Sequence, residues 1–292
     1  ENVDRLLQSP ASQRGRDFAI ILQSLADLDY IVEWRIINAA EYGMPQRRKR
    51  TYILAYKKGT AIANTITDAT KWLFEDGVFA KAFPVQPYAY LTPLHGSPIK
   101  QDITKDLADV SVEFNANNKY RFFENAGVMI DGMFYTYKTE PNYSGAYTTL
   151  GDVLVKGDDR KYLSEEFYIS EEALPRWEYL KGAKREVKKN RAGQEFIYSE
   201  GGMAFPDALD KASRTIITSE GGTSPSRFSH VVKDPVDGRL RRLLPIELER
   251  LNMFPDNHTE GESDVKRAFF MGNALVCGII TAVGNELKKR LG

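Results

Sequence analysis

Residues 38 to 50 of this chain read NAAEYGMPQRRKR, with Gly43 and Pro45 ahead of four consecutive basic residues. Glycine and proline interrupt helices and strands, so this polar, basic segment is predicted to be a loop. Before it, residues 32–36 alternate apolar and polar side chains, and after it residues 52–56 are rich in β-forming side chains. Both patterns are typical of strands. The loop is therefore expected to connect two strands of one sheet.

Helical patterns lie outside these strands, near both ends of the chain. Residues 10–28 carry apolar side chains at helical spacing, namely Phe18, Ile21, Leu22 and Leu25. This pattern predicts an amphipathic helix that packs on the sheet. A second helix is expected to begin at Pro245, which suits a first helical turn, and to end before Pro255. A last helix is predicted from about Asn273 to Leu291.

The middle of the chain, residues 59–235, has a different texture. It consists of short aromatic-rich pieces with frequent glycine and proline, which indicates a separate, mostly irregular β domain. A hairpin is predicted at residues 127–137, where Asp131 and Gly132 separate two apolar runs and suit a tight turn. Residues 72–79 are expected to include a short helix. Residues 220–227 are expected to form a flexible polar loop, which is either an ordinary surface loop or one that approaches a phosphate backbone.

The composition limits the classes to which the protein can belong. The chain has 292 residues, of which 42% are hydrophobic and 27% charged, as in a globular protein of one or two domains. The sequence shows neither a bilayer-length apolar run nor a secretion leader, so we expect no membrane insertion and no secretion. The single cysteine, Cys277, excludes an internal disulfide and favours a reducing compartment. We therefore expect a cytoplasmic location, and the scattered histidines predict no metal site: His95, His230 and His258.

Lysine and arginine together number 40, and so do aspartate and glutamate, so only local clusters can attract a polyanion. One cluster is the basic run at 47–50. The other comprises Lys181, Lys184, Arg185, Lys188, Lys189 and Arg191. We expect the second cluster to be a solvated face, because basic runs without other support usually are.

Three separated regions carry motifs that resemble one family, in that family's order. They are the opening triplet ENV (1–3), the loop 38–50, and RLLPIELERLNMFPD (242–256) followed by MGNALV (271–276). These regions resemble motif six, motifs seven and eight, and motifs nine and ten of the DNA cytosine-5 methyltransferases. The pattern Gly-x-Pro-Gln-x-Arg-x-Arg before a strand is the most specific piece, and the triplet is the least specific.

The resemblance implies an α/β fold. The chain would hold part of the doubly wound, Rossmann-like sheet of S-adenosylmethionine-dependent methyltransferases, together with a smaller, mostly β or irregular target-recognition domain. The expected segments are the catalytic part with motifs six to eight (1–58), the recognition domain (59–235), and a return to the catalytic domain with motifs nine and ten (236–292).

The resemblance also implies a chemistry. Family members add a cysteine thiolate to C6 of a flipped cytosine, so that C5 can take a methyl group from S-adenosylmethionine. By resemblance, the carboxyl group of Glu1 binds N3 and the N4 amine of the base. Arg50 lies near O2, and Arg48 supports the loop or binds a phosphate. The alternatives are a frayed terminal carboxylate for Glu1 and surface salt bridges for the two arginines.

Further residues are expected to bind cofactor or DNA. Asn273, at the start of the predicted last helix, would contact the amino-acid end of S-adenosylmethionine or act as a plain cap, and Ala274 would contribute only backbone. Double-stranded DNA is the expected partner, with contacts from Arg214, Thr215, Ser224 and Arg227. Gln46 either braces the loop or contacts DNA, and we favour bracing.

Two family patterns do not occur in these residues: the Phe-x-Gly-x-Gly turn that holds the cofactor, and the Pro-Cys pair that bears the nucleophile. Cys277 follows motif ten and is expected to be a small buried residue. We therefore expect this segment alone to be inactive and to need an N-terminal catalytic half, from the same protein or from a separate subunit. Alone, it is also expected to self-associate or to be unstable, because a sheet face would stand exposed.

The function implied is methylation of a specific duplex site in a restriction-modification system, in the bacterial cytoplasm or nucleoid. One alternative is the DNA-recognition subunit of a split methyltransferase, inactive alone. Weaker alternatives are an RNA-directed relative, against which the long recognition region argues, and a DNA-binding module without catalytic activity.

Overall fold

The computed structural model describes residues 1–88, 101–103, 105–117 and 120–291, so His95 lies outside the described residues. The chain divides into two compact units. Unit 1 comprises residues 1–43, 48–146 and 279–292, and unit 2 comprises residues 44–47 and 147–278. This division differs from the predicted segments, because residues 59–146 belong with the first strands and residues 236–278 belong with the middle of the chain.

Unit 1 is built on a six-stranded sheet in the order β1-β3-β2-β6-β7-β5. The strands are β1 (Asn2–Val3), β2 (Tyr30–Asn38), β3 (Lys49–Lys57), β5 (Gln101–Asp102), β6 (Ala126–Ile130) and β7 (Met133–Tyr137). Both β1 and β2 pair antiparallel with β3, so they run parallel to each other and end at the edge where β3 begins. The loop that joins β2 to β3 therefore lies at this edge, as predicted.

The predicted hairpin is confirmed. β6 and β7 pair antiparallel, and the turn between them consists of Asp131 (φ 52°) and Gly132 (φ 75°). Two consecutive positive φ values are typical of the tight turn that asparagine or aspartate followed by glycine favours. β6 pairs with β2. This pairing adds the hairpin to the sheet of unit 1 and explains why residues up to 146 do not form a separate domain.

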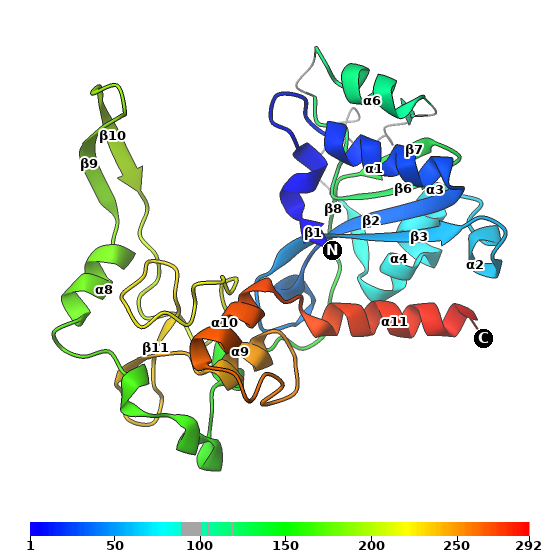
Figure 1. Cartoon of the computed structure of the whole chain (residues 1–292). Coiled ribbons are helices and arrows are strands. Elements are labelled where there is room, and N and C mark those ends of the chain that lie inside the picture. The colour runs from blue at the N-terminus through cyan, green and yellow to red at the C-terminus, as the bar shows by residue number, and fades with distance from the viewer. Residues whose placement is uncertain (89–100, 104, 118–119, 292) are drawn as a thin grey trace. The chain divides into compact units, whose positions relative to one another are not determined.

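Helices cover both faces of the sheet, so unit 1 has three layers (Figure 1). α1 (Arg16–Asp27) and α6 (Leu107–Glu113) lie on one face, and α4 (Val78–Ala82) and α11 (Cys277–Leu291) lie on the other. The shorter elements are η1 (Asp4–Gln8), η2 (Ala39–Tyr42), α2 (Ala61–Asn64), α3 (Ala69–Lys71), the π-helical turn η3 (Trp72–Asp76) and a small pair, β4 (Val85–Pro87) with β8 (Thr139–Pro141). α1 begins later than residue 10, because Gly15 takes a φ of 87° just before it.

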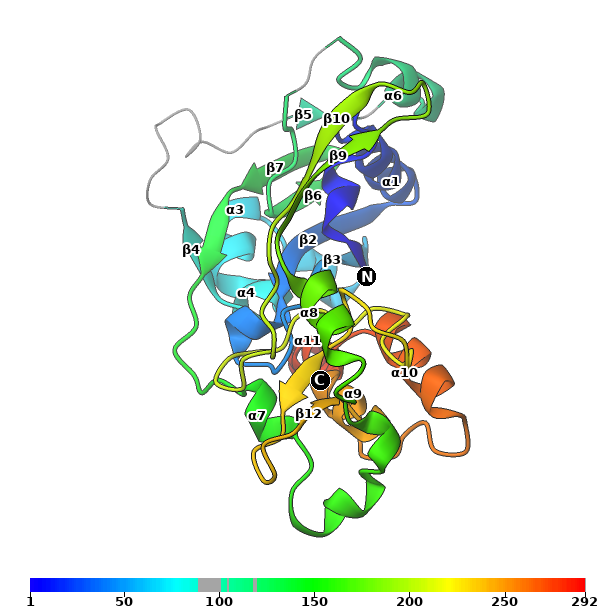
Figure 2. The same cartoon turned by 90° about the vertical axis from the view of Figure 1, so that its left-hand side faces the viewer.

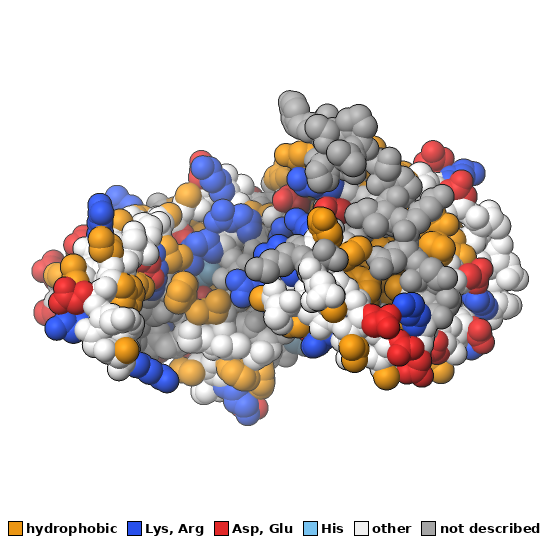
Figure 3. Space-filling model, turned by 90° about the horizontal axis from the view of Figure 1, so that it is seen from above, with side chains coloured by type: hydrophobic (Ala, Val, Ile, Leu, Met, Phe, Trp, Pro, Cys, Tyr) orange, Lys and Arg blue, Asp and Glu red, His pale blue; other side chains and the backbone are white. Residues whose placement is uncertain are grey.

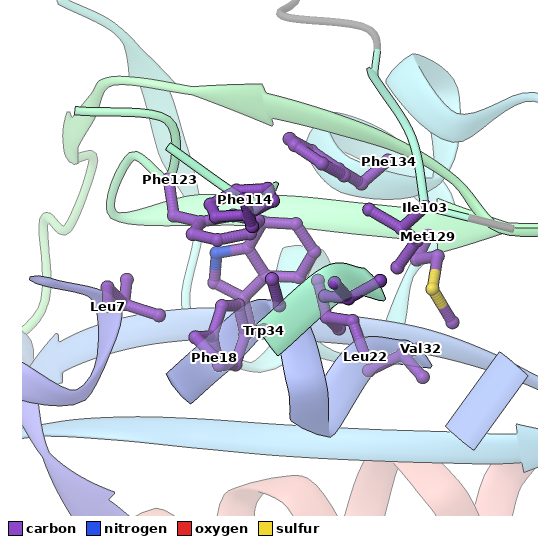
Figure 4. Packing of buried hydrophobic residues seen from close by; sticks show 12 residues of the cluster. Leu7, Phe18, Leu22, Val32, Trp34, Ile103, Phe114, Phe123, Met129 and Phe134 are labelled. Atoms are coloured by element: carbon purple, nitrogen blue, oxygen red, sulfur yellow. The ribbon is translucent and has the colours of Figure 1, made fainter. Parts of the chain in front are cut away.

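Trp34 of β2 is the centre of the apolar core between α1 and the sheet (Figure 4). Its ring meets Phe18, Phe123 and Phe134 edge-on at centroid distances of 5.2, 5.9 and 6.5 Å. Gly127 lies opposite Trp34, and a Cβ atom there would stand 2.0 Å from the indole ring. The indole therefore fits only because position 127 lacks a side chain.

The other face of the sheet carries a buried arginine. Arg35 is 2% exposed and donates hydrogen bonds to the carbonyl groups of Leu73, Phe79 and Phe83, with donor–acceptor distances of 2.7, 3.1 and 2.7 Å. Leu73 and Phe79 belong to the predicted helical stretch at residues 72–79, which is confirmed as η3 and the start of α4, and Phe83 directly follows α4. Arg35 thus ties that stretch to β2 and keeps it within unit 1.

Unit 2 consists of short elements and long irregular segments. Its strands form two pairs, β9 (Lys184–Lys189) with β10 (Glu195–Glu200) and β11 (Val231–Lys233) with β12 (Leu240–Arg242). Its helices are α7 (Leu150–Val153), η4 (Gly157–Tyr162), η5 (Glu165–Phe167), α8 (Leu174–Lys181), α9 (Pro245–Leu251) and α10 (Asp264–Asn273). The helix expected at Pro245 is confirmed. The last helix begins at Cys277, however, so its predicted start at Asn273 is wrong.

A buried ionic cluster connects the strands and helices of unit 2. Arg241 is fully buried; it donates to Asp234 at 2.7 Å and to both oxygens of Glu247 at 2.8 Å. Glu247 also accepts hydrogen bonds from the amides of Val155 and Leu244 at 2.9 Å. Arg241 therefore pairs with two buried carboxylates, one of which caps α9, and Arg160 also donates to Asp234 at 2.8 Å.

The stability of unit 2 should depend on Asp234 at low pH. Burial alone would raise the pKa of this carboxyl group, but hydrogen bonds from Arg241, the Val236 amide and Arg160 lower it to about 2. A carboxyl with a lower pKa in the folded than in the unfolded state stabilises the fold above the unfolded pKa of about 4. That contribution, about 2 kcal/mol, is lost as the pH falls from about 4 to about 2.

Urea unfolding at stepped pH values checks this expectation. The parent protein should lose more stability between pH 4 and pH 2 than an Asp234→Asn variant, which has no carboxyl at this position. Equal losses for the two proteins would contradict the assignment to Asp234.

The β9–β10 pair is a two-stranded ribbon, and Figure 2 shows its whole length. Val187, Phe196 and Ile197 on it are 67%, 46% and 59% exposed. The second basic cluster lies on and beside this ribbon, and most of it is solvated as expected. Lys181 is the exception, because it is 1% exposed and its ammonium group donates to the Ser229 carbonyl. Burial lowers the pKa of Lys181 to about 8.

Within the described part of the chain, no single helix is both long and apolar enough to cross a bilayer. Only α10 and α11 taken together, as a pair bent by 45°, meet that condition of length and composition.

Candidate functional site

The residues expected to hold the target base meet at one edge of unit 1. β1 pairs with β3 so that Val3 stands opposite Arg50, and Glu1 extends beyond the pair. The Arg50 Nε atom lies 3.3 Å from the Glu1 carboxylate, and both side chains are about one-fifth exposed. A carboxylate and a guanidinium therefore face partly open space together, and the roles expected of Glu1 and Arg50 stay predictions.

Side-chain alternation along β3 brings two more groups to the same face. Arg48, 3% exposed, and Tyr52, 4% exposed, lie two residues to either side of Arg50. Burial and the charge of Arg50 lower the pKa of the Arg48 guanidinium, while Glu1 and Tyr52 oppose this. Burial, followed by the charge of Glu1, raises the pKa of the Tyr52 hydroxyl. The face thus joins one carboxylate, two guanidiniums and one phenol.

The Tyr52 hydroxyl is buried and has no hydrogen-bond partner among the described residues. Removing it should therefore cost little stability: for Tyr52→Phe we expect an unchanged or slightly raised thermal midpoint. Tyr56 on the same strand offers a matched control, since its hydroxyl donates to buried Glu33 at 2.5 Å. Tyr56→Phe should destabilise by about 1–3 kcal/mol. A larger loss for Tyr52→Phe than for Tyr56→Phe in thermal unfolding would contradict this interpretation.

Gln46 is fully buried in unit 2, and both ends of its amide are satisfied. Its Nε2 donates to Asn252 Oδ1 at 2.7 Å, and its Oε1 accepts from the Ile216 amide at 3.1 Å. These bonds fit the bracing role that the sequence favours. The contact of Gln46 with DNA, the less favoured alternative, stays a prediction.

The arginines expected to bind DNA are internal braces in unit 2. Arg214 donates to both oxygens of Asp207, at 2.7 and 3.1 Å, and to the Phe228 carbonyl at 3.0 Å. Arg227 forms an ion pair with Glu200 at 3.0 Å and donates to the Leu180 carbonyl at 2.8 Å. These donors brace unit 2, and the DNA contacts expected of Arg214 and Arg227 stay predictions.

Two polar residues of the same region are placed differently. Thr215 donates its hydroxyl to the Arg47 carbonyl at 2.5 Å, so it positions the exposed Arg47 next to it in space. Ser224 is exposed in the glycine-rich loop. Both remain candidate DNA contacts, and Arg47 joins them because its guanidinium is accessible.

The residues expected at the cofactor lie where α10 ends. The Asn273 amide donates to the Phe269 carbonyl at 3.1 Å, and the Ala274 amide donates to the Phe270 carbonyl at 2.8 Å. Asn273 therefore stands at a helix C-terminus, where carbonyl groups carry partial negative charge, and the predicted helix N-terminus at this residue is wrong. Its exposed amide oxygen and the Ala274 carbonyl are the groups left for a ligand.

Cys277 is the first residue of α11 and its amide donates to the Asn252 carbonyl at 2.8 Å. Burial raises the pKa of its thiol. A raised pKa reduces the thiolate fraction, and the thiolate is the form that attacks. The expectation that Cys277 is not the nucleophile is therefore supported.

Sequence reasoning missed two residues that the structure makes prominent. Tyr52 could have been found from strand alternation, which places it on the face of Arg48 and Arg50. Arg241 directly precedes the third matching region and looked like one more surface cation, and only the fold reveals its two buried carboxylate partners.

Charges of both signs are interspersed with hydrophobic side chains on the face shown in Figure 3. This distribution agrees with equal numbers of basic and acidic residues, 40 each, in the chain. Attraction of a polyanion must therefore come from local groups, as the sequence implies.

The class of protein follows from the fold, from the motif order and from the group of Glu1, Arg48 and Arg50, here called the edge cluster. The chain belongs to the C-5 cytosine-specific DNA methylase family, whose sequence model matches residues 1–289. It is similar to M.Sau3AI, a type II methyltransferase of Staphylococcus aureus, with 41% identity over 291 residues, 99% of this chain and 66% of that protein. M.NlaIV, a type II methyltransferase of Neisseria lactamica, is 33% identical over 91 residues, 29% of this chain and 22% of that protein.

A comparison of structures agrees on the fold. The crystal structure of the Dnmt2 methyltransferase of S. pombe matches all of this chain with a TM-score of 0.50 and 14% identity, over 66% of its own length. The predicted fold class, a methyltransferase-type α/β sheet with a smaller second unit, is therefore confirmed. The chain spans slightly less than two thirds of the length of both M.Sau3AI and this structure. S-adenosylmethionine is the methyl donor of the family.

Proposed function

We propose that the full-length protein is a type II DNA (cytosine-5) methyltransferase of a restriction-modification system. It would transfer the methyl group of S-adenosylmethionine to C5 of a flipped cytosine in a specific duplex site. The observation that supports this most is the edge cluster of Glu1, Arg48 and Arg50, in a chain that belongs to the C-5 cytosine-specific DNA methylase family.

The edge cluster supplies what the pyrimidine ring needs. Addition of a nucleophile at C6 moves electron density toward N3 and O2 of the ring. The Glu1 carboxyl group can hydrogen-bond N3 and the N4 amine, and the Arg50 guanidinium can stabilise charge at O2. Their 3.3 Å ion pair holds the two groups side by side before a base arrives. Buried Arg48, on the same face of β3, adds positive charge behind them.

The residues at the end of α10 fit one part of S-adenosylmethionine, its amino-acid end. The exposed Asn273 amide oxygen and the Ala274 carbonyl are acceptors suited to the ammonium group at the amino-acid end of the ligand. The ligand supplies the methyl group. Because both backbone and side-chain donors at this turn are already used, these two residues would orient the ligand by accepting hydrogen bonds.

The nucleophile is proposed to come from outside these 292 residues. The sequence has no Pro-Cys pair, and the pKa of its one thiol is raised by burial. Two sources remain open: another part of the same polypeptide, or a separate subunit that makes this chain the recognition component of a split enzyme. Double-stranded DNA is the proposed substrate, contacted by Arg47, Thr215 and Ser224, and the proposed location is the bacterial cytoplasm.

Transfer of a tritiated methyl group from S-adenosylmethionine to mixed-sequence DNA tests the proposal. We expect activity for the full-length protein and none for residues 1–292 alone. Activity of residues 1–292 alone would contradict the proposed source of the nucleophile. No transfer by the full-length protein, even after mixing with a chain that bears the cofactor and Pro-Cys motifs, would contradict the function itself.

The expected self-association of residues 1–292 is checked by size-exclusion chromatography of that segment. A sharp monomer peak would contradict it.

A further inference from the structure

A second feature of unit 1 lies close in sequence to the edge cluster: a cleft of about 690 Å³. Four of its lining residues are cationic, Arg5, Arg14, Lys49 and Arg121, and one is acidic, Asp4. No site residue predicted from the sequence belongs to this cleft. Its lining carries a net charge of +3, in a chain whose total charge is zero.

The cations of the cleft are only partly neutralised. Lys49 pairs with Asp4 at 3.8 Å, and Arg121 pairs with Glu124 at 3.6 Å; both distances are too long for a strong hydrogen bond. Arg5 and Arg14 have no ion-pair partner among the described residues, and both are exposed. Two guanidiniums therefore present free donors toward one cleft.

The segment that carries these two arginines is held firmly. Gln8 donates its amide to the Phe123 carbonyl at 3.2 Å, and Gln13 donates to the Phe114 carbonyl at 2.8 Å. The Arg14 carbonyl accepts from Asn115 Nδ2 at 2.8 Å. The backbone beneath both arginines is thus fixed, and a ligand need only order their side chains.

The cleft lies at the edge where β1 and β2 end and β3 begins. Asp4 and Arg5 follow β1 directly, and Lys49 is the first residue of β3. Side-chain alternation directs Lys49 to the opposite face of β3 from Arg48 and Arg50. Glu1 and Arg50 on one face and the cationic cleft on the other therefore share one edge of the sheet.

We propose that this cleft binds the sugar-phosphate backbone of DNA beside the target nucleotide, with Arg5 and Arg14 as the phosphate-binding residues. The inference rests on the proposed function, which brings a DNA strand to Glu1 and Arg50. DNA carries one phosphate per roughly 3.4 Å of each strand, so a strand along this edge presents several phosphates to an open cleft. Planar guanidiniums with free donors match phosphate oxygens in pairs.

The test measures duplex DNA binding by the full-length protein over a series of salt concentrations. The variant is Arg5→Ala with Arg14→Ala. The control, Lys81→Ala with Lys288→Ala, removes the same charge from exposed residues of unit 1, neither of which has an ion-pair partner in the described part of the chain. Arg5→Lys with Arg14→Lys keeps the charge and guards against a loss due to misfolding, which the thermal midpoint also reports.

We expect the slope of log K against log salt to become less steep by about 2 for the alanine variant, since each phosphate that the protein no longer neutralises changes the slope by about 0.9. At low salt its affinity should fall by roughly 10- to 100-fold, the lysine variant should recover part of this loss, and the control should match the parent. S-adenosylmethionine binding should not change in any variant.

An unchanged slope for a folded alanine variant would overturn the proposal. So would displacement of DNA from the parent by inorganic phosphate, at matched ionic strength, down to the affinity of the alanine variant, because the cleft would then be a small-anion site. Methyl transfer is measured in parallel. A parent protein that binds DNA with the expected slope but transfers no methyl group would contradict the proposed function, and the proposal that the cleft binds DNA would still hold.

Discussion

Replacing Glu1 by glutamine in the full-length protein is expected to lower the rate constant for methyl transfer to DNA by about 10²- to 10⁴-fold. Glutamine keeps the size of the side chain but can neither transfer a proton to N3 of the cytosine nor carry the charge of the carboxyl group. The fold should change little, because Glu1 is only partly buried and its ion-pair partner, Arg50, lies at 3.3 Å. Single-turnover methylation at saturating DNA and S-adenosylmethionine measures the rate constant.

Glu41, an exposed carboxylate of η2 in the same unit, gives the matched control. Glu41→Gln should retain the parental rate. DNA affinity of Glu1→Gln should stay within about tenfold of the parent, because the carboxyl acts on the base and contributes little to backbone binding. Parental activity in Glu1→Gln would remove Glu1 from the proposed chemistry.

The largest loss of stability is expected from Arg241→Met. Methionine fills a similar volume but leaves fully buried Glu247 without a cation, while Asp234 keeps its ion pair with Arg160. Removing one partner from a buried ion pair costs about 3–5 kcal/mol, because the remaining charge is uncompensated. Urea unfolding followed by tryptophan fluorescence measures the change, and Trp177 of α8 reports on unit 2.

Arg239 offers the same substitution at a neighbouring position. Its side chain is 48% exposed and pairs with Glu165, which is 78% exposed, so Arg239→Met should cost far less stability than Arg241→Met. Similar losses for the two variants would show that the buried cluster contributes no more than a surface pair.

Local patterns predicted the parts of the fold that local forces determine. Alternation identified β2 and β-forming side chains identified β3, the loop between them follows from Gly43 and Pro45, and Asp131-Gly132 identified the β6–β7 hairpin. The pairing of β6 with β2 is a contact between distant segments, and no short window of sequence contains it. For this reason the sequence patterns separated residues 59–146 from the strands with which they pack.

In the candidate site, too, some features follow from local sequence and others depend on contacts between distant segments. The face that Glu1, Arg48 and Arg50 share follows from motif order and strand alternation. The roles of Arg214 and Arg227 could not be predicted, because a surface arginine and a bracing arginine have the same local sequence. What separates them is the carboxylates and carbonyls that fold against them, such as Asp207 for Arg214.

The β9–β10 ribbon has a consequence for the behaviour of the protein in concentrated solution. A ribbon of two strands leaves open amide and carbonyl groups along its edges, which can template another strand. Lys184, Lys188 and Lys189 of β9 pair with Glu200, Glu186 and Glu195, so they leave little free charge to repel a second molecule. Val187 of β9 and Phe196 and Ile197 of β10 are exposed on the same ribbon. Edge-to-edge aggregation would therefore be driven by these apolar side chains, on either strand.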